Sequence, residues 1–279
     1  MRWWWTIGWL VGCAGVEMSE EPTAPPEAPQ QEQLARVEAP PPAPSEDKVM
    51  SPAAERGLAL ATDTHRLLPD NVGNDLVCTS CHLENATRPK AAPWVGVTDR
   101  YPRYRKRSGK VDTLQERING CFQRSMNGTP LATDSEEMAA LVAYAEFVSE
   151  GVDGVDMPGA GMPRITSPEP PNAARGQHVY ETQCMACHQA NGEGLTLPDG
   201  QLMFPALWGD GSFNVGAGMA RLDTAAAFVK WNMPLNQGGT LTDQEAYDVA
   251  AWFTVQQRPD LEGKEGDWPN GDKPADARY

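Results

Sequence analysis

The sequence predicts an all-α fold with long loops, arranged as two small helical modules behind an N-terminal tether. The chain has 279 residues, which is enough for two domains of ordinary size. Its 25 prolines and 26 glycines indicate much irregular backbone, and no segment alternates apolar and polar residues as a half-buried strand would. The closing segments of both modules instead carry apolar residues at helical spacing, so we expect helices to form the cores.

Charge and hydropathy exclude two classes of protein. Lysine and arginine number 23 against 38 aspartates and glutamates, and the resulting net charge of −15 argues against a nucleic-acid partner. No apolar stretch reaches the roughly 18–20 residues that span a bilayer, which excludes a polytopic membrane protein. Hydrophobic residues make up only 40% of the chain. Because this is little for two cores, we expect something other than side chains to fill part of them.

The first residues have the features of an export signal. A short positive start precedes an apolar run over residues 3–10, which is too short for a transmembrane helix. The run ends in residues 10–13 (LVGC), which resemble a bacterial lipobox, so we expect removal of residues 1–12 and a lipid on Cys13; the alternative is an ordinary signal before a surface cysteine. This lipid anchor would be the protein's one membrane contact, on the periplasmic side. Small rather than acidic residues follow Cys13 and favour the outer membrane.

Two proline-rich segments divide the remainder of the chain. The first is dominated by Glu, Pro, Ala and Gln and cannot bury enough apolar surface to offset the entropy of ordering, so it predicts a disordered tether. The second separates two blocks of similar length. The predicted organisation is a signal peptide at residues 1–12, a tether at 13–50, a first module at 51–152, a linker at 153–172, a second module at 173–258 and a polar tail at 259–279.

Each module contains one copy of the motif C-x-x-C-H. The copies are formed by Cys78, Cys81 and His82 and by Cys184, Cys187 and His188. This motif attaches c-type haem through two thioether bonds, with the histidine as an iron ligand. A single copy could instead be a redox dithiol or half of a zinc site, but zinc would need a second nearby pair or more than the four histidines present. Two copies in an exported chain predict two covalently attached haem c groups, and hence two c-type cytochrome domains.

Helices are expected before the second motif and at the end of both modules. The helix that closes the second module covers residues 241–253, where Thr242 and Glu245 have the spacing of a capping box. The helix that closes the first module covers residues 135–148. A third helix, over residues 174–180, leads into the second pair of haem cysteines.

The sixth iron ligand in the second module is expected to be Met233. It lies in Asn-Met-Pro between the attachment motif and the closing helix. Ligation by histidine and methionine raises the reduction potential of a haem and suits electron transfer. Met203 and Met219 are alternatives, because methionine in such loops also serves as packing.

The corresponding position in the first module holds Cys121, the one cysteine assigned to neither haem attachment nor lipid. Thiolate ligation would lower the haem potential and would place a nucleophilic sulfur beside the iron. The alternative is a structural cysteine, with Met126 or His65 as the iron ligand.

A basic segment surrounds Cys121. Residues 88–124 contain ten lysines and arginines against three acidic residues. Such a run is often a solvated surface, but here it includes the unassigned cysteine. Because guanidinium groups bind small oxyanions through two parallel hydrogen bonds and lower the pKa of a nearby thiol, the segment predicts a site for a small dianion.

Several segments together carry a resemblance to a known family. They are residues 76–83, 93–97, 114–128, 205–209, 212–221 and 232–234, of which 114–128 around Cys121 is the most specific. Over residues 57–253 the chain resembles the dihaem thiosulfate dehydrogenases, which also act as tetrathionate reductases. The resemblance implies His82 and Cys121 as ligands of a catalytic haem and His188 and Met233 as ligands of the second. It also implies that Arg107, Arg117 and Ser125 line the substrate site.

The sequence departs from the family at two points. Some relatives have a lysine that can compete for the second haem where this chain has Asn232, so a ligand switch is not expected here. Most relatives are simple periplasmic proteins, whereas this chain has the predicted lipid anchor.

The resemblance implies the coupling of two thiosulfates to tetrathionate, with Cys121 forming a transient sulfur–sulfur adduct and Ser125 donating a hydrogen bond to the anion. The two electrons would pass to the second haem and then to a cytochrome c or other periplasmic redox partner. A non-catalytic dihaem electron carrier is one alternative. An enzyme related to the haem subunit of the multienzyme sulfur-oxidation system, which attaches thiosulfate to a carrier protein, is another.

Overall fold

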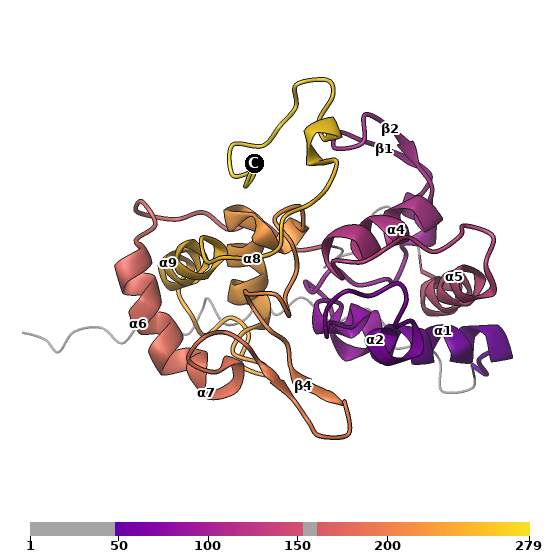
Figure 1. Ribbon diagram of the computed structural model, residues 1–279, viewed down its shortest axis with the longest axis horizontal. Coiled ribbons are helices and arrows are strands. Elements are labelled where there is room, and N and C mark those ends of the chain that lie inside the picture. The colour runs from indigo at the N-terminus through magenta and orange to yellow at the C-terminus, as the bar shows by residue number, and fades with distance from the viewer. Residues whose placement is uncertain (1–47, 153–160) are drawn as a thin grey trace, which may run out of the picture. The chain divides into compact units, whose positions relative to one another are not determined.

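The computed structural model describes residues 48–152 and 161–279 (Figure 1). The predicted signal peptide, Cys13, most of the tether and residues 153–160 of the linker lie outside this part of the chain. Within it, no helix is both long and apolar enough to cross a membrane. The prediction of a mostly helical chain with long loops is confirmed.

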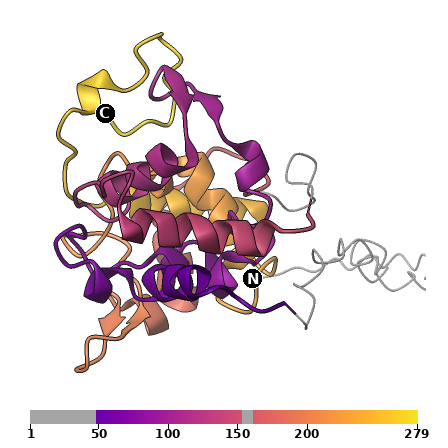
Figure 2. The ribbon, with the colours of Figure 1, turned by 90° about the vertical axis from the view of Figure 1, so that its right-hand side faces the viewer.

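The first module is built around two helices that lie side by side, the first and last of the block (Figure 2). Its elements are α1 (Pro52–Thr62), α2 (Thr64–Leu67), the 3-10 turns η2 (Cys78–Ser80) and η3 (Thr98–Arg100), α3 (Leu83–Ala86), β1 (Arg103–Arg105), β2 (Lys110–Asp112), α4 (Leu114–Arg124) and α5 (Glu136–Ser149). Helices α1 and α5 approach closely at Gly57, where a Cβ atom would lie 2.0 Å from the Ala140 carbonyl oxygen. Only glycine permits this crossing.

The second module repeats this arrangement with its own first and last long helices. Its elements are α6 (Ala173–Gln183), α7 (Met185–His188), β3 (Leu195–Thr196), β4 (Leu202–Phe204), the 3-10 turn η4 (Gly218–Ala220), α8 (Leu222–Asn232) and α9 (Asp243–Thr254); the 3-10 turn η5 (Lys264–Gly266) lies in the tail that follows. Helices α6 and α9 cross at Gly176, where a Cβ atom would lie 1.9 Å from the Asp248 carbonyl oxygen. Tyr180 and Val249 are buried in the core beside this crossing.

The three expected helices form close to their predicted boundaries. Thr242 caps α9 and exchanges hydrogen bonds with Glu245 in the predicted capping box. Ser135 caps α5, and α6 extends to residue 183, three residues beyond the predicted end. Two antiparallel hairpins, β1–β2 and β3–β4, were not expected. Their strands have two or three residues, which is too short for an alternating pattern to be visible in the sequence.

A buried carboxylate ties the start of α6 to α9. Asp248, which is 2% exposed, accepts hydrogen bonds from the Asn172 N–H at 2.6 Å and the Arg175 Nε at 2.6 Å, and a third comes from Gln244 at 2.9 Å. Burial raises the pKa of the Asp248 carboxyl, but these donors lower it by more, so the pKa lies below its usual range. The carboxylate therefore stabilises the fold at neutral pH.

Replacing this carboxylate should remove a pH-dependent part of the stability. Because the pKa of Asp248 is lower in the folded state, its contribution is present above the unfolded pKa and is lost as the pH falls through the folded pKa. Asp248→Asn should lower the free energy of unfolding at pH 7 by about 1–3 kcal/mol and flatten the decline in acid. Denaturant unfolding measured from neutral pH into acid checks this expectation, with Glu181→Gln on the exposed face of α6 as the control. Parallel pH profiles for wild type and Asp248→Asn would contradict the assignment.

Candidate active site

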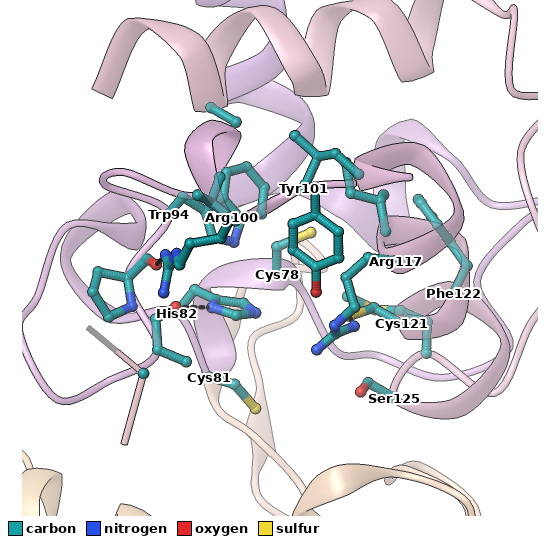
Figure 3. Close-up of a pocket in the computed structure, with 18 of the residues that line it drawn as sticks. Cys78, Cys81, His82, Trp94, Arg100, Tyr101, Arg117, Cys121, Phe122 and Ser125 are labelled. Carbon is teal, nitrogen blue, oxygen red and sulfur yellow. Dashed lines mark hydrogen bonds between the residues drawn. The ribbon is translucent and has the colours of Figure 1, made fainter. Parts of the chain in front are cut away.

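A cavity of about 250 Å³ lies in the first module beside the first haem-attachment motif (Figure 3). Cys78, Cys81 and His82 line one part of it, and Cys121 and Ser125 of the α4 segment line another. The cavity thus brings the predicted attachment residues together with the predicted sixth ligand.

Both motif histidines are oriented as iron ligands. The Nδ1–H of His82 donates to the Ala92 carbonyl at 2.6 Å, and the Nδ1–H of His188 donates to the Pro205 carbonyl at 2.9 Å. A histidine held in this way presents the lone pair of Nε2 to a metal. The four motif cysteines are free thiols, and burial raises the pKa of Cys78 and of Cys81 to about 12. The residues present therefore fit covalent haem at both motifs.

Cys121 has the setting of a reactive thiol. It lies on α4, which begins with a capping box between Thr113 and Glu116, and Arg117 precedes it by one helical turn. The Arg117 Nη1 donates a hydrogen bond to the Cys121 Sγ at 2.8 Å. Burial raises the pKa of Cys121, but Arg117 and His82 lower it by more, to about 6. The sulfur is therefore largely thiolate at neutral pH.

The cavity is strongly cationic. Four arginines line it, with no carboxylate side chain among the described lining residues: Arg100, Arg103, Arg105 and Arg117. Arg103 and Arg105 stand two residues apart on β1, so they share one side of the strand. Figure 3 shows the Tyr101 hydroxyl pointing toward the Arg117 guanidinium, on the side of Cys121. This arrangement favours a small anion next to the thiolate.

Most of the other cations in the basic segment are neutralised by carboxylates. The ion pairs are Arg88–Glu84, Lys106–Asp272, Arg107–Asp267, Lys110–Glu116 and Arg124–Asp267. Lys90 lies over the Trp231 ring, 4.1 Å from its centroid. The positive charge that remains is therefore concentrated at the cavity.

The structure brings most, but not all, of the predicted substrate residues together. Arg117, Ser125 and Cys121 line the same cavity. Arg107 instead donates to the Gly216 carbonyl and lies against Asp267, outside this lining. The sequence did not single out Arg100, Arg103 and Arg105 from the other cations of the basic segment; for Arg103 and Arg105 the i, i+2 spacing before Ser108-Gly109 was the available signal.

The two alternatives to Cys121 as the sixth iron ligand in the first module lie in other surroundings. Met126 lines the same cavity but is buried in the hydrophobic core of the module. His65 lies at the other cavity, where its Nε2–H donates to the Gly200 carbonyl at 3.1 Å. Of these candidates, Cys121 is the one that combines the cavity position with a charge partner.

A larger cavity, of about 560 Å³, contains the second motif. Met233 lines it together with His188, and so do the alternatives Met203 and Met219, of which Met203 is 48% exposed. Residues of the first module complete its wall. Leu76, Val77 and Cys81 line both cavities, so one short segment separates the two sites.

Comparisons with known proteins match both modules. Residues 71–153 match the family model "SoxA/TsdA, cytochrome c domain", and residues 171–253 match "Cytochrome C oxidase, cbb3-type, subunit III". The two cytochrome c domains bind two covalently attached c-type haems.

Two relatives and one solved structure are similar over most of the chain. The thiosulfate dehydrogenase of Psychrobacter arcticus is 47% identical over 233 residues, covering 83% of this chain and 71% of the relative. That of Allochromatium vinosum is 42% identical, covering 79% and 84%. The structure titled thiosulfate dehydrogenase (TsdBA) from Marichromatium purpuratum, "as isolated" form, has a TM-score of 0.74 and 39% identity, covering 82% of this chain. The match spans about half of that solved chain, 51%.

Proposed function

This chain belongs to the dihaem thiosulfate dehydrogenase family, and we propose that it couples two thiosulfate anions to tetrathionate at the Cys121 cavity. It is an oxidoreductase that oxidises thiosulfate and delivers the electrons to a redox partner. The observation that carries the proposal is the Arg117 guanidinium 2.8 Å from the Cys121 sulfur, in a cavity lined by four arginines.

The linings of the two cavities support an assignment of the residues that hold the haems. Cys78 and Cys81 would attach the first haem, and His82 and Cys121 would ligate its iron. Cys184 and Cys187 would attach the second haem, and His188 and Met233 would ligate its iron. When bound, the haems supply iron centres that take up one electron each.

The cavity arginines reduce the repulsion between two bound thiosulfate anions. Two unit charges about 4 Å apart repel by about 4 kcal/mol at an effective dielectric constant near 20, and thiosulfate carries two charges. Arg103, which is exposed, and Arg105 and Arg117, which are half-buried, line the cavity and offset this repulsion. The Ser125 hydroxyl adds a neutral hydrogen-bond donor at the end of α4.

The reaction is expected to proceed through Cys121. Its thiolate bonds to the outer sulfur of one thiosulfate, which releases two electrons and leaves a cysteine S-thiosulfonate with one negative charge. The outer sulfur of a second thiosulfate then attacks the adduct at the sulfur that lies between the Cys121 Sγ and the sulfonate group. Tetrathionate forms, the bond to Cys121 breaks and the thiolate returns. Arg117 stabilises the thiolate at the beginning and at the end of the cycle.

The proposal is tested by measuring turnover in both directions with the purified holoprotein. We expect thiosulfate to reduce ferricyanide in the presence of the protein, with tetrathionate as the product and no carrier protein required. Tetrathionate reduction with a reduced viologen dye tests the reverse reaction. Absence of turnover with either sulfur anion would refute the proposed chemistry and favour an electron carrier. A requirement for a carrier protein would favour the sulfur-oxidation type of enzyme.

Met233 is expected to set the potential of the second haem. Met233→Gly should lower that potential and slow electron exit, because methionine ligation stabilises the reduced iron. Substrate binding should change little, since the substrate cavity does not include Met233 among its described lining residues. A redox titration of wild type and variant measures this, with Met203→Gly as the matched control. An unchanged potential in Met233→Gly would assign the ligand to Met203 or Met219 instead.

We also propose that a lipid on Cys13 anchors the protein to the periplasmic side of a membrane, with the outer membrane favoured. Cys13→Ser should move the protein to the soluble periplasmic fraction or leave its precursor uncleaved. Cell fractionation and mass spectrometry of the N-terminal peptide measure this. A wild-type protein found wholly in the soluble fraction with an unmodified N-terminus would exclude the anchor.

A further inference from the structure

Two of the four cavity arginines stand on an element that is weak by itself. Arg103 and Arg105 belong to β1, which pairs only with β2 in a two-stranded sheet. Each strand has three residues, and an isolated hairpin of this size is marginally stable in water. The positions of these two guanidinium groups therefore depend on whatever holds the hairpin.

The tail of the chain supplies that support. We call residues 264–272 the C-terminal strap. The Trp268 N–H donates to the Arg107 carbonyl at 2.8 Å, and the Arg107 guanidinium lies over the Trp268 ring, 4.8 Å from its centroid. Asn270 donates to the Tyr104 hydroxyl at 3.0 Å, on β1 itself. Trp268 is only 7% exposed, so the strap packs against the protein rather than lying loosely upon it.

The tip of the hairpin also touches the strap. Lys106 pairs with Asp272 at 3.6 Å. Gly109 has a φ of +68° and lies so close to the strap that an added Cβ would be 2.5 Å from Pro269. This contact needs glycine both for its backbone conformation and for its space.

Asp267 joins the hairpin to α4. Its carboxylate is 2.6 Å from Arg124, on the helix that also carries Arg117 and Cys121, and 3.8 Å from Arg107, in the turn between β1 and β2. The Tyr279 hydroxyl donates to the same carboxylate. The Asp267 side chain is 7% exposed, so this double ion pair is well shielded from solvent and from salt.

We propose that the strap, through Asp267, positions the Arg103–Arg105 side of the anion site against the Cys121 side. Asp267 is a positioning residue: it acts through Arg107 and Arg124 and lies outside the cavity lining. The inference rests on the proposed function, because it assigns to the strap a part in capturing the substrate anion. It also gives Arg107 a role in holding the hairpin.

This role affects substrate capture more than chemistry. Loss of Asp267 leaves Arg117 next to Cys121, since that hydrogen bond lies within one helix. It lets the hairpin arginines move away from the anion. Asp267→Asn should therefore raise the KM for thiosulfate about tenfold while kcat stays within about twofold of wild type.

The test measures the hairpin and the kinetics separately in the holoprotein. Trypsin cleaves after the exposed Lys106 or its arginine neighbours only when the hairpin opens, so the rate of nicking reports how firmly the strap holds it. Asp267→Asn should nick several times faster than wild type. Asp260→Asn is the control, because the described contacts of this exposed carboxylate, an ion pair with Lys264 and a hydrogen bond from the Leu261 N–H, do not reach the hairpin. Asn270→Ala is a milder second variant that removes a surface hydrogen bond to β1 and should act in the same direction.

The outcomes separate the two proposals. Faster nicking together with a raised KM in Asp267→Asn and in Asn270→Ala supports the positioning role. Nicking and KM equal to those of Asp260→Asn would refute it, and so would faster nicking with an unchanged KM. A wild-type protein without thiosulfate turnover would refute the proposed function alone, and the nicking rates would still decide whether the strap holds the hairpin.

Discussion

Cys121→Met is expected to keep both haems and to lose thiosulfate turnover by more than about a thousandfold. Methionine retains a sulfur that can ligate iron, but it cannot be deprotonated and cannot form the sulfur–sulfur adduct. The Arg117 guanidinium, 2.8 Å from the native sulfur, would lose its anionic partner as well. The loss should appear equally in both directions of the reaction.

The measurement combines haem content, redox titration and turnover in both directions. Gln123→Met is the matched control, since it introduces methionine on the exposed face of the same helix. We expect this control to match wild type in all three respects. Turnover near the wild-type rate in Cys121→Met would mean that the sulfur is only an iron ligand. It would favour the alternative that the protein is a non-catalytic electron carrier.

Arg117→Ala should produce the second-largest effect, a fall of about a hundredfold in kcat/KM for thiosulfate. The variant loses a guanidinium that can bind an oxyanion through two hydrogen bonds, and the charge next to Cys121 disappears. Since Arg117 is one of the groups that lower the pKa of Cys121, its removal should raise that pKa. Both effects act in the same direction, but the nucleophile itself remains, so the loss is smaller than in Cys121→Met.

Arg88→Ala provides the control for net charge. It removes the same charge from the same basic segment, but Arg88 pairs with Glu84 outside the described lining of the cavity. Steady-state kinetics of both variants at two salt concentrations measure the difference. Equal losses in the two variants would mean that only the overall charge of the segment matters. Little loss in Arg117→Ala would mean that the hairpin arginines, rather than Arg117, capture the anion.

The sequence allowed good predictions wherever the signal was local. The capping-box spacing of Thr242 and Glu245 marked the start of the helix that closes the second module, because a cap is set by its own residue and the next three. Haem attachment was evident from five contiguous residues at each motif.

Predictions failed or stayed open where the contact was distant in sequence. Arg107, which the resemblance places at the substrate site, pairs in the structure with Asp267, near the other end of the chain. The hairpin itself was missed because its strands are short and its support comes from that same tail. Met203, Met219 and Met233 all reach the second cavity, so position along the chain does not separate them.

The helix crossings at Gly57 and Gly176 show that the two modules share one arrangement of helices but differ in the length of their connections. Gly57 and Gly176 occupy the same place in the two helix pairs, but the chain from Gly57 to its attachment motif is much longer than the chain from Gly176 to Cys184. The extra length contains α2 and the loop beyond it, and Thr62, His65 and Leu76 from this region line the cavity of the second module. The longer connection of the first module thus forms part of the wall of the cavity that holds the second motif. A second module severed from the first would have that side of its haem in water, and its reduction potential would no longer be that of the whole chain.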